Sequence, residues 1–149
     1  LADGKSSRLQ KALIDPGLST SLFMYDFPFK DNGLFISYAF LNPGENHKKI
    51  EEIILNTYKE IIDNGISDDE LKRAKAQTKA SVAFSRDGSY AVASAINEAL
   101  AIGDWTFYTT FIKKIKSVTI NDIKSVANKY LIDNQKTTGW FISNNNETN

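Results

Sequence analysis

The 149-residue chain contains no cysteine. This absence excludes disulfide bonds, thiolate metal sites and a cysteine nucleophile together, and it leaves the redox compartment undecided. The sequence also has only one histidine, His47, and contains neither a G-x-S-x-G motif nor a glycine-rich phosphate loop. No apolar run approaches the roughly 20 residues of a membrane-spanning helix. No signal peptide is visible, and because the chain begins at Leu1 rather than methionine we expect a processed product or a piece of a longer protein.

An excess of charge of either sign is also lacking. The 18 Lys and Arg residues balance 18 Asp and Glu residues, so the formal net charge is zero. A balanced chain has no general electrostatic attraction to nucleic acid or to an anionic membrane, and we expect neither as a partner. With 42% hydrophobic and 24% charged residues, the composition indicates one globular domain that is large enough to bury a core.

The clearest structural pattern that is present lies between residues 33 and 65. Residues 34–41 alternate as a strand with two largely apolar faces, which predicts cover on one face and partial cover on the other. Asn42-Pro43-Gly44 ends the strand. A long amphipathic helix follows and ends at the C-terminal cap Asn64-Gly65. Its apolar stripe comprises Ile50, Ile53, Ile54, Tyr58, Ile61 and Ile62.

The residues before this unit predict a short helix and a partner strand. Ser6 or Ser7 can cap a helix that ends at Asp15-Pro16-Gly17. Residues 18–29 then read as a strand, and residues 30–33 as a turn that contains Asn-Gly. Two extended runs joined in this way indicate an antiparallel hairpin. One side of the first strand is predicted to carry Leu22, Met24 and Phe27.

The rest of the chain is predicted to be mainly helical. Ser67 and Glu70 have the spacing of a capping box at the start of a helix that runs to about Phe84. Ser89 is expected to cap the next helix, residues 105–116 form a helix or turn, and Thr119 caps a helix that ends near Tyr130. Residues 136–143 are predicted to be a last strand, and residues 144–149 a polar tail. The buried stripe of the helix after Thr119 is expected to contain Ile120, Ile123, Val126, Ala127 and Tyr130.

This order predicts an α+β fold in which helices are layered on one face of a small, mainly antiparallel sheet. We expect residues 1–143 to form a single domain. No internal repeat or linker interrupts them.

The chemistry in the sequence does not amount to a complete enzyme. His47 and Glu51 share one helix face and could touch a metal, but a usual zinc site needs three protein ligands. A solvated histidine is therefore the expected role of His47, and no catalytic or metal-binding residue is assigned. The lysines at 113, 114 and 116 are expected on the solvent-exposed side of an amphipathic segment. The aromatic residues between 105 and 111 are expected to pack in the core or in an interface.

A series of short motifs in a fixed order carries a family resemblance. The motifs are Gly4-Lys5-Ser6-Ser7-Arg8-Leu9, Gly17-Leu18-Ser19, Gly33-Leu34-Phe35, Pro43-Gly44, Gly65-Ile66-Ser67, Glu70-Leu71, Ala74-Lys75, Phe84-Ser85-Arg86-Asp87, Val118-Thr119, Tyr130-Leu131 and Thr138-Gly139-Trp140-Phe141. Together they span most of the chain. The series resembles the non-catalytic, C-terminal-type domain of the pitrilysin/insulinase-type zinc peptidases, the inverted zincins that include the mitochondrial processing peptidases.

The resemblance implies a function that this chain does not perform alone. In these peptidases a catalytic half carries H-x-x-E-H and a distal glutamate, holds zinc and uses the motif glutamate as general base. A related half without the motif closes a chamber around unfolded peptide. This chain lacks H-x-x-E-H, so the resemblance implies the second half, with no cofactor of its own and zinc in the catalytic partner domain. It also implies a bacterial periplasm or cell envelope.

Two departures from the family pattern concern the substrate site and the sheet. The family often clamps substrate with an Arg before the Gly-Leu and a Tyr after it; here Leu13 or Ile14 and Thr20 hold those positions, and Arg8 matches a structural arginine. Ser19 and Thr20 are therefore the only substrate-binding residues predicted. The family domain also begins with two strands and a helix before the S-R-L motif, so we expect a sheet that lacks its first strands. Its unpaired edge and an uncovered apolar face would then be open to a partner, a second copy or a missing part of the chain.

Three hypotheses for the function follow. The preferred one is the non-catalytic half of a zinc metalloendopeptidase that supports peptide hydrolysis by a separate H-x-x-E-H domain. The second is a catalytically inactive peptide-binding or assembly module of the same fold. The third is an unrelated α+β domain, against which the ordered motifs argue.

Overall fold

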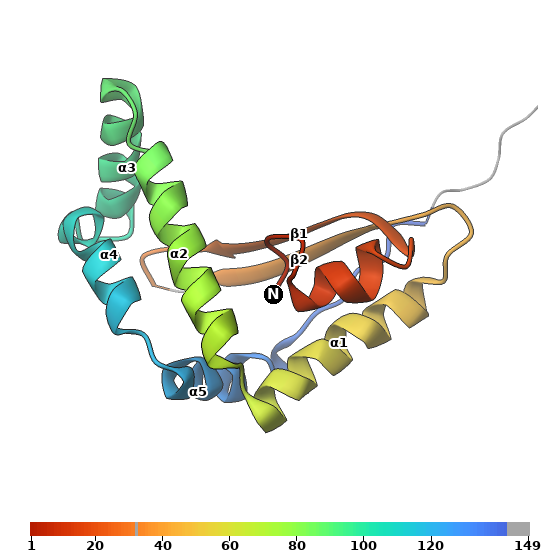
Figure 1. Ribbon diagram of the computed structural model, residues 1–149. Coiled ribbons are helices and arrows are strands. Elements are labelled where there is room, and N and C mark those ends of the chain that lie inside the picture. Colours follow the sequence, from red (N-terminus) through yellow and green to blue (C-terminus); the bar gives the residue numbers. More distant parts are fainter. Residues whose placement is uncertain (32, 143–149) are drawn as a thin grey trace, which may run out of the picture.

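A computed structural model describes residues 1–31 and 33–142 (Figure 1). The described residues form an α+β fold built from one β-hairpin and a set of helices. The predicted tail at 144–149 lies outside the described residues. The elements are η1 (Gln10–Ile14), β1 (Ser19–Phe27), β2 (Leu34–Leu41), α1 (His47–Asn64), α2 (Asp68–Phe84), α3 (Ser89–Ala101), α4 (Thr106–Ser117), α5 (Ile120–Tyr130) and η2 (Asp133–Gln135).

The hairpin is antiparallel, as predicted. Phe27 lies opposite Leu34 at its turn end, and Met24 lies opposite Ser37. Leu22 and Met24 share one face, but Phe27 lies on the other, so its predicted side was wrong. The physical reason is the two-residue period of a strand, which separates residues 24 and 27 onto opposite faces. Asn32 of the predicted turn lies outside the described residues.

The core lies between the hairpin, η1 and α1 (Figure 1). Leu9 and Leu13 are fully buried, and Ile50 of α1 is 2% exposed. These three side chains pack together against partly buried residues of the hairpin's inner face, Leu22, Met24 and Ala39 among them. The predicted short helix is present as a π-helical turn, but serine does not cap it. Ser7 Oγ is buried and has no hydrogen-bond partner among the described residues.

The long helices begin and end largely where local chemistry predicts. The Ser67 side chain accepts from the Glu70 amide, and the Glu70 side chain accepts from the Ser67 amide, which completes the capping box of α2. Thr119 caps α5 in the same way with Asp122. Gly65 ends α1 with φ 75°. The predicted Ser89 cap was wrong. Gly88 occupies the N-cap position of α3 and has no side chain that could accept a capping hydrogen bond.

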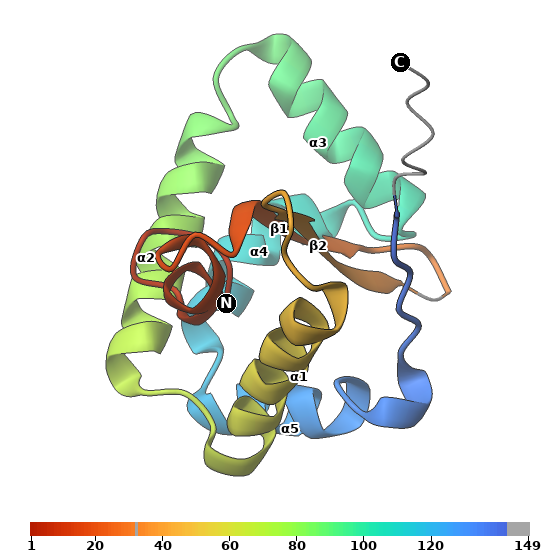
Figure 2. The same ribbon diagram turned by 90° about the vertical axis from the view of Figure 1, so that its right-hand side faces the viewer.

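The helices after α1 are far less buried than their apolar stripes predict. Neither α2 nor α4 contains a fully buried residue. In α5 only Ala127 is buried, whereas Val126 and Tyr130 are more than half exposed, so the predicted stripe was wrong for those two. In Figure 2, α2, α3 and α4 surround the hairpin, while α1 and α5 lie side by side below it. Within the described residues, too little of the chain packs against these helices to bury their apolar stripes.

The predicted last strand is absent over residues 136–142, and residue 143 lies outside the described part. A strand needs a hydrogen-bonded neighbour, and β2 pairs only with β1. The segment lies instead near the start of α1, where Trp140 Nε1 donates to Glu51 Oε2 at 3.2 Å. Across residues 1–31 and 33–142, none of the helices is both long and apolar enough to cross a membrane.

Candidate functional site

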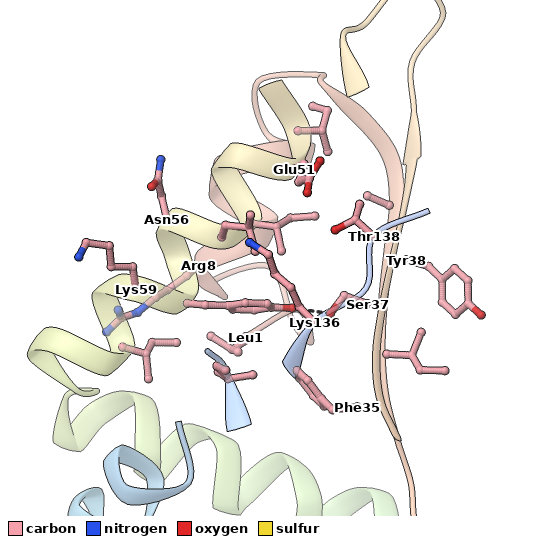
Figure 3. A pocket seen from close by; sticks show the side chains of 18 of the residues that line it. Leu1, Arg8, Phe35, Ser37, Tyr38, Glu51, Asn56, Lys59, Lys136 and Thr138 are labelled. Atoms are coloured by element: carbon pink, nitrogen blue, oxygen red, sulfur yellow. Dashed lines mark hydrogen bonds between the residues drawn. The ribbon is translucent and has the colours of Figure 1, made fainter. Parts of the chain in front are cut away.

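The hairpin has one packed face and one open face. The open face, which we call the outer face, is defined by the register of β1 and β2. Tyr25, Tyr38 and Phe40 on it are 50%, 51% and 55% exposed. Figure 3 shows Tyr38 on the side of β2 away from α1, with Ser37 and Phe35 on the α1 side. The outer face comprises Ser21, Phe23, Tyr25, Phe27, Leu34, Ile36, Tyr38 and Phe40.

Aromatic rings on the outer face contact one another. The Phe23 ring stacks on Tyr25 with centroids 6.3 Å apart and meets Phe40 edge-on at 6.2 Å. Tyr25 also lies 5.9 Å from Phe27. A shallow hollow of about 250 Å³ is lined by Phe23, Tyr25, Tyr38 and Phe40. The result is an exposed, continuous aromatic surface on a two-stranded support.

A second open region, the groove, lies along β2 between the hairpin and α1 and also reaches the outer-face residues Tyr38 and Phe40. It has a volume of about 2480 Å³ and is lined by β2, α1, α5 and the extended residues 136–141 (Figure 3). Among the described residues, the edge of β2 that borders it pairs with no strand. Unpaired backbone amides and carbonyls at such an edge can accept an additional strand. The exposed sheet edge expected from the sequence is therefore present.

One polar pair in the groove joins β2 to α1. The Ser37 hydroxyl and the Tyr58 hydroxyl form a hydrogen bond between β2 and α1. Burial raises the pKa of Tyr58, and the bond to Ser37 offsets part of that effect. A phenol with a raised pKa stays neutral and is a poor base at neutral pH. This pair therefore fixes α1 on the hairpin and offers no nucleophile with a base beside it.

Arg8 connects three segments at the junction where α1 ends and α2 begins. Its Nε donates to Glu70 Oε1 at 2.6 Å, and one Nη donates to Glu70 Oε2 at 2.9 Å and to the Gly65 carbonyl at 3.2 Å. The Arg8 side chain is the main reason that the pKa of Glu70 falls to about 2. The structural role expected for Arg8 is confirmed, because it joins the turn before η1 to the end of α1 and the start of α2.

The two predicted substrate-binding residues lie at the start of β1, where the strand contains a β-bulge. Ser19 lies opposite Leu41 while Ser21 lies opposite Phe40, so Thr20 is an extra residue. This bulge turns Ser19 inward, where it is 2% exposed. Thr20 is exposed and donates from Oγ1 to the Phe40 carbonyl at 3.2 Å. Leu13, near the family's arginine position, is fully buried in the core.

The residues around His47 do not fit a zinc site. The centroid of its ring lies 6.0 Å from that of the Trp140 ring. The nearby Glu51 carboxylate accepts a hydrogen bond from the Trp140 indole N–H. Within residues 1–31 and 33–142, no group of three or more His, Asp or Glu side chains could hold a metal ion. Nothing in this region therefore supplies the ligand set that zinc needs.

The aromatic character of the outer face was not recognised as a site from the sequence. The signal was available, because Phe23, Tyr25 and Phe27 recur at every second position of a predicted strand. Such a pattern is usually assigned to core. The structure shows that the open face of the hairpin is the one opposite η1 and α1.

Comparison with known proteins identifies the family. A family model described as the peptidase M16 inactive domain matches residues 1–78, just over half of the chain. The chain belongs to the peptidase M16 family. Its matched part corresponds to the inactive domain of these zinc proteases, in agreement with the missing H-x-x-E-H motif.

Curated relatives of this M16 domain are zinc proteases and processing peptidases. The chain is 27% identical to the zinc protease PqqE of Helicobacter pylori over 93% of its own length and 31% of that protein. It is 31% identical to an uncharacterised zinc protease of Streptomyces coelicolor, over 88% of the chain and 29% of that protein. The mitochondrial-processing peptidase subunit beta of Lentinula edodes is also 31% identical, over 86% of the chain and 28% of that protein. The chain thus spans under a third of the length of these relatives.

Solved structures agree with the M16 assignment. The inactive peptidase domain of a zinc protease from Bordetella parapertussis superposes with a TM-score of 0.88 at 26% identity, covering 100% of this chain and 80% of that one. A protease from Helicobacter pylori gives a TM-score of 0.83 at 26% identity, covering 91% of this chain and 33% of that one. The fold described above is therefore that of the inactive domain.

Proposed function

We propose that this domain, residues 1–143, is the non-catalytic half of a zinc metalloendopeptidase and closes the substrate chamber of a separate H-x-x-E-H half. Zinc and the reacting groups belong to that catalytic half. This domain supplies a wall that holds unfolded peptide close to them. Holding a reactant near a catalytic group lowers the entropic part of the barrier, even when the holding surface carries no reactive group.

The outer face is the observation that carries this proposal. A monomeric protein rarely leaves a large continuous apolar surface exposed unless the surface binds something. Here Phe23, Tyr25 and Phe40 are close to half exposed, although the opposite face of the same strands packs against the core. An unfolded peptide presents the apolar side chains that such a surface accepts, whereas a folded protein hides most of them.

The start of β1 is the proposed polar contact for the same peptide. Thr20 is exposed at the bulge, and Ser19 beside it is buried. Thr20 is therefore the one of the two that we propose contacts the peptide, because Ser19 as a whole residue is only 2% exposed. The free edge of β2 offers further backbone hydrogen bonds to an extended chain.

Reconstitution with a catalytic half tests the proposal. The zinc-loaded H-x-x-E-H half from the same source is mixed with this chain, and hydrolysis of an unfolded peptide is followed by mass spectrometry. We expect no hydrolysis by this chain alone, slow hydrolysis by the catalytic half and at least tenfold faster hydrolysis by the mixture. Leu13→Asp is the control, because a carboxylate at a fully buried position unfolds the core and should abolish the stimulation.

The alternative function is an inactive peptide-binding or assembly module. The free edge of β2 favours it, because that edge can pair with another strand without any catalytic partner. A stable complex of the two halves with an unchanged rate of hydrolysis would support this module. Absence of both a complex and a stimulation would contradict the chamber proposal.

A further inference from the structure

We propose that the hollow between Phe23, Tyr25, Tyr38 and Phe40 is a subsite for one large apolar side chain of an extended peptide. The inference rests on the proposed function and adds the class of peptide that the domain selects. Segments that carry leucine, methionine or phenylalanine would be held at this position, and segments with only polar or charged side chains would not. We call these four residues the ring subsite.

The size of the hollow indicates a single side chain. Its volume of about 250 Å³ lies below the roughly 300–1,000 Å³ of sites for small-molecule ligands. The hollow lies on an open strand surface, so a peptide backbone can run above it. Alternate side chains of an extended peptide are spaced about 6.6–6.8 Å apart, like alternate residues of β1. One side chain therefore enters the ring subsite, and the residues two positions away lie over the rest of the outer face.

The chemistry of the outer face selects apolar side chains. None of its eight residues is Asp, Glu, Lys or Arg. A charged peptide side chain placed there would lose hydration without gaining an ion pair. Aromatic rings can also attract cations, but the cation–π contacts within the described residues involve Tyr108, Phe107 and Tyr130, none of which lies on the outer face.

The area of the outer face favours a peptide over a second copy of the chain. Its six largest exposed side chains are between 42% and 58% exposed. At about 200 Å² for each side chain, they present roughly 600 Å². A standard interface buries about 800 Å² on each partner. The surface is thus small for a stable dimer, and its width of two strands matches one extended chain.

Four acetylated heptapeptides test the subsite. They share the frame Thr-Ser-Thr-X-Thr-Ser-Thr, and X is leucine, phenylalanine, lysine or aspartate. Binding is measured by NMR titration of the wild-type chain with assigned aromatic resonances. We expect the leucine and phenylalanine peptides to bind about tenfold tighter than the other two, because burying one large apolar side chain is worth that much or more. The largest shifts should come from the rings of the subsite.

Two variants and a matched control follow. Tyr38→Ser and Phe40→Ser should each reduce the affinity for the leucine peptide to that of the aspartate peptide. Tyr90→Ser removes an aromatic ring that is 86% exposed on α3, and it should change nothing. Circular dichroism checks that each variant is folded. The wild-type titration requires no variant, so a misfolded variant leaves the test intact.

Several results would overturn the subsite. Equal affinity for all four peptides would do so, as would tighter binding of the lysine peptide. Shifts that map to Ser37 and Tyr58 would place the peptide in the groove instead. A concentration-dependent dimer in sedimentation that Tyr38→Ser abolishes would identify a second copy as the occupant.

The hydrolysis assay separates this inference from the proposed function. If the chain stimulates the catalytic half equally with the leucine and aspartate peptides, the ring subsite is wrong and the chamber proposal stands. If the chain binds the leucine peptide selectively but never stimulates hydrolysis, the subsite stands and the chamber proposal is wrong.

Discussion

Glu70 performs two tasks with one carboxylate. Its Oε2 accepts from the Ser67 amide at 2.8 Å, which caps α2, and it also accepts from Arg8. Both side chains of the ion pair are about one quarter exposed. Hydrogen bonds to charged, partly buried groups are worth more than surface ion pairs. Replacing either Arg8 or Glu70 should therefore lower the stability of the domain.

Replacing Arg8 by methionine tests that statement. The variant Arg8→Met leaves the Glu70 carboxylate and the Gly65 carbonyl without their donors, so we expect the free energy of unfolding to fall by about 2 kcal/mol. Urea unfolding followed by circular dichroism measures it. Lys59→Met is the matched control, because Lys59 and Asp63 form an ion pair at 3.5 Å with side chains that are 74% and 52% exposed. That variant should lose no more than about 0.5 kcal/mol, and equal losses in both would contradict the role of Arg8.

The lowered pKa of Glu70 predicts how stability depends on pH. Its pKa is about 2 in the folded chain against an ordinary value of 4.5, so the folded state favours the charged carboxylate. The stabilisation is present in full above pH 4.5 and is lost as the pH falls from there toward 2. We expect the difference in unfolding free energy between the wild type and Glu70→Gln to shrink over that range. A difference that is the same at pH 6 and pH 3 would show that this pair does not titrate as described.

At the scale of elements, the ends of helices were more predictable than their burial. The capping boxes of α2 and α5 and the glycine after α1 depend on residues only three or four positions apart. The exposure of Val126 and Tyr130 depends on what packs against α5 from elsewhere in the chain. Local chemistry determines the first kind of feature, whereas tertiary contacts determine the second. The missing strand at 136–142 is of the second kind, because a strand exists only with a partner.

The residues of the candidate site show the same division. The alternation of β2 predicted two apolar faces, one covered and the other only partly covered, and in the structure the second face is open. The bulge at Thr20 has no sequence signature as clear as a glycine or proline, so the inward side of Ser19 could not be predicted. A structural role for Arg8 was predicted from the family motif, but its pairing with Glu70 was not.

The end of α1 offers a prediction at this scale. Gly65 has φ 75° and ψ −155°, a conformation that is nearly restricted to glycine and costs other residues of order 1–3 kcal/mol. Gly65→Ala should therefore destabilise the domain by that amount, although a Cβ would meet Ile120 only at an ordinary 3.8 Å. Gly139→Ala is the control, because a Cβ at position 139 would have no neighbour within 4 Å. Thermal unfolding of both variants decides between backbone strain and crowding, and an unaffected Gly65→Ala would exclude the strain.

At the scale of the whole molecule, the buried side chains are unevenly distributed. The packed cluster of Leu9, Leu13 and Ile50 joins η1, the hairpin and α1. Neither α2 nor α4 adds a buried residue, and α3 adds only Ala99. Stability concentrates where apolar contacts are dense. The half of the chain that ends at α1 is therefore the more stable half.

Hydrogen exchange can measure this difference. We expect amides in the middle of α1 to exchange at least tenfold more slowly than those in the middle of α2 and α4, because opening α1 exposes buried isoleucines. Mass spectrometry of peptic fragments gives the rates. Adding the catalytic half should slow the exchange of β1 and β2 if it covers the outer face. Uniform protection across α1, α2 and α4 would contradict the uneven core.

The bulge at Thr20 has a consequence for how such domains diverge. Before it, odd-numbered residues of β1 point inward, and after it they point outward, so this one residue sets the phase of the strand. Deleting Thr20 would alter the composition very little, and it would join Ser19 directly to Ser21, so that Ser19 stays inward opposite Leu41 in an unbroken alternation. Between relatives, a one-residue gap at this position therefore leaves every aligned side chain on the same face, whereas a strand of the same length without the bulge would turn Ser19 outward.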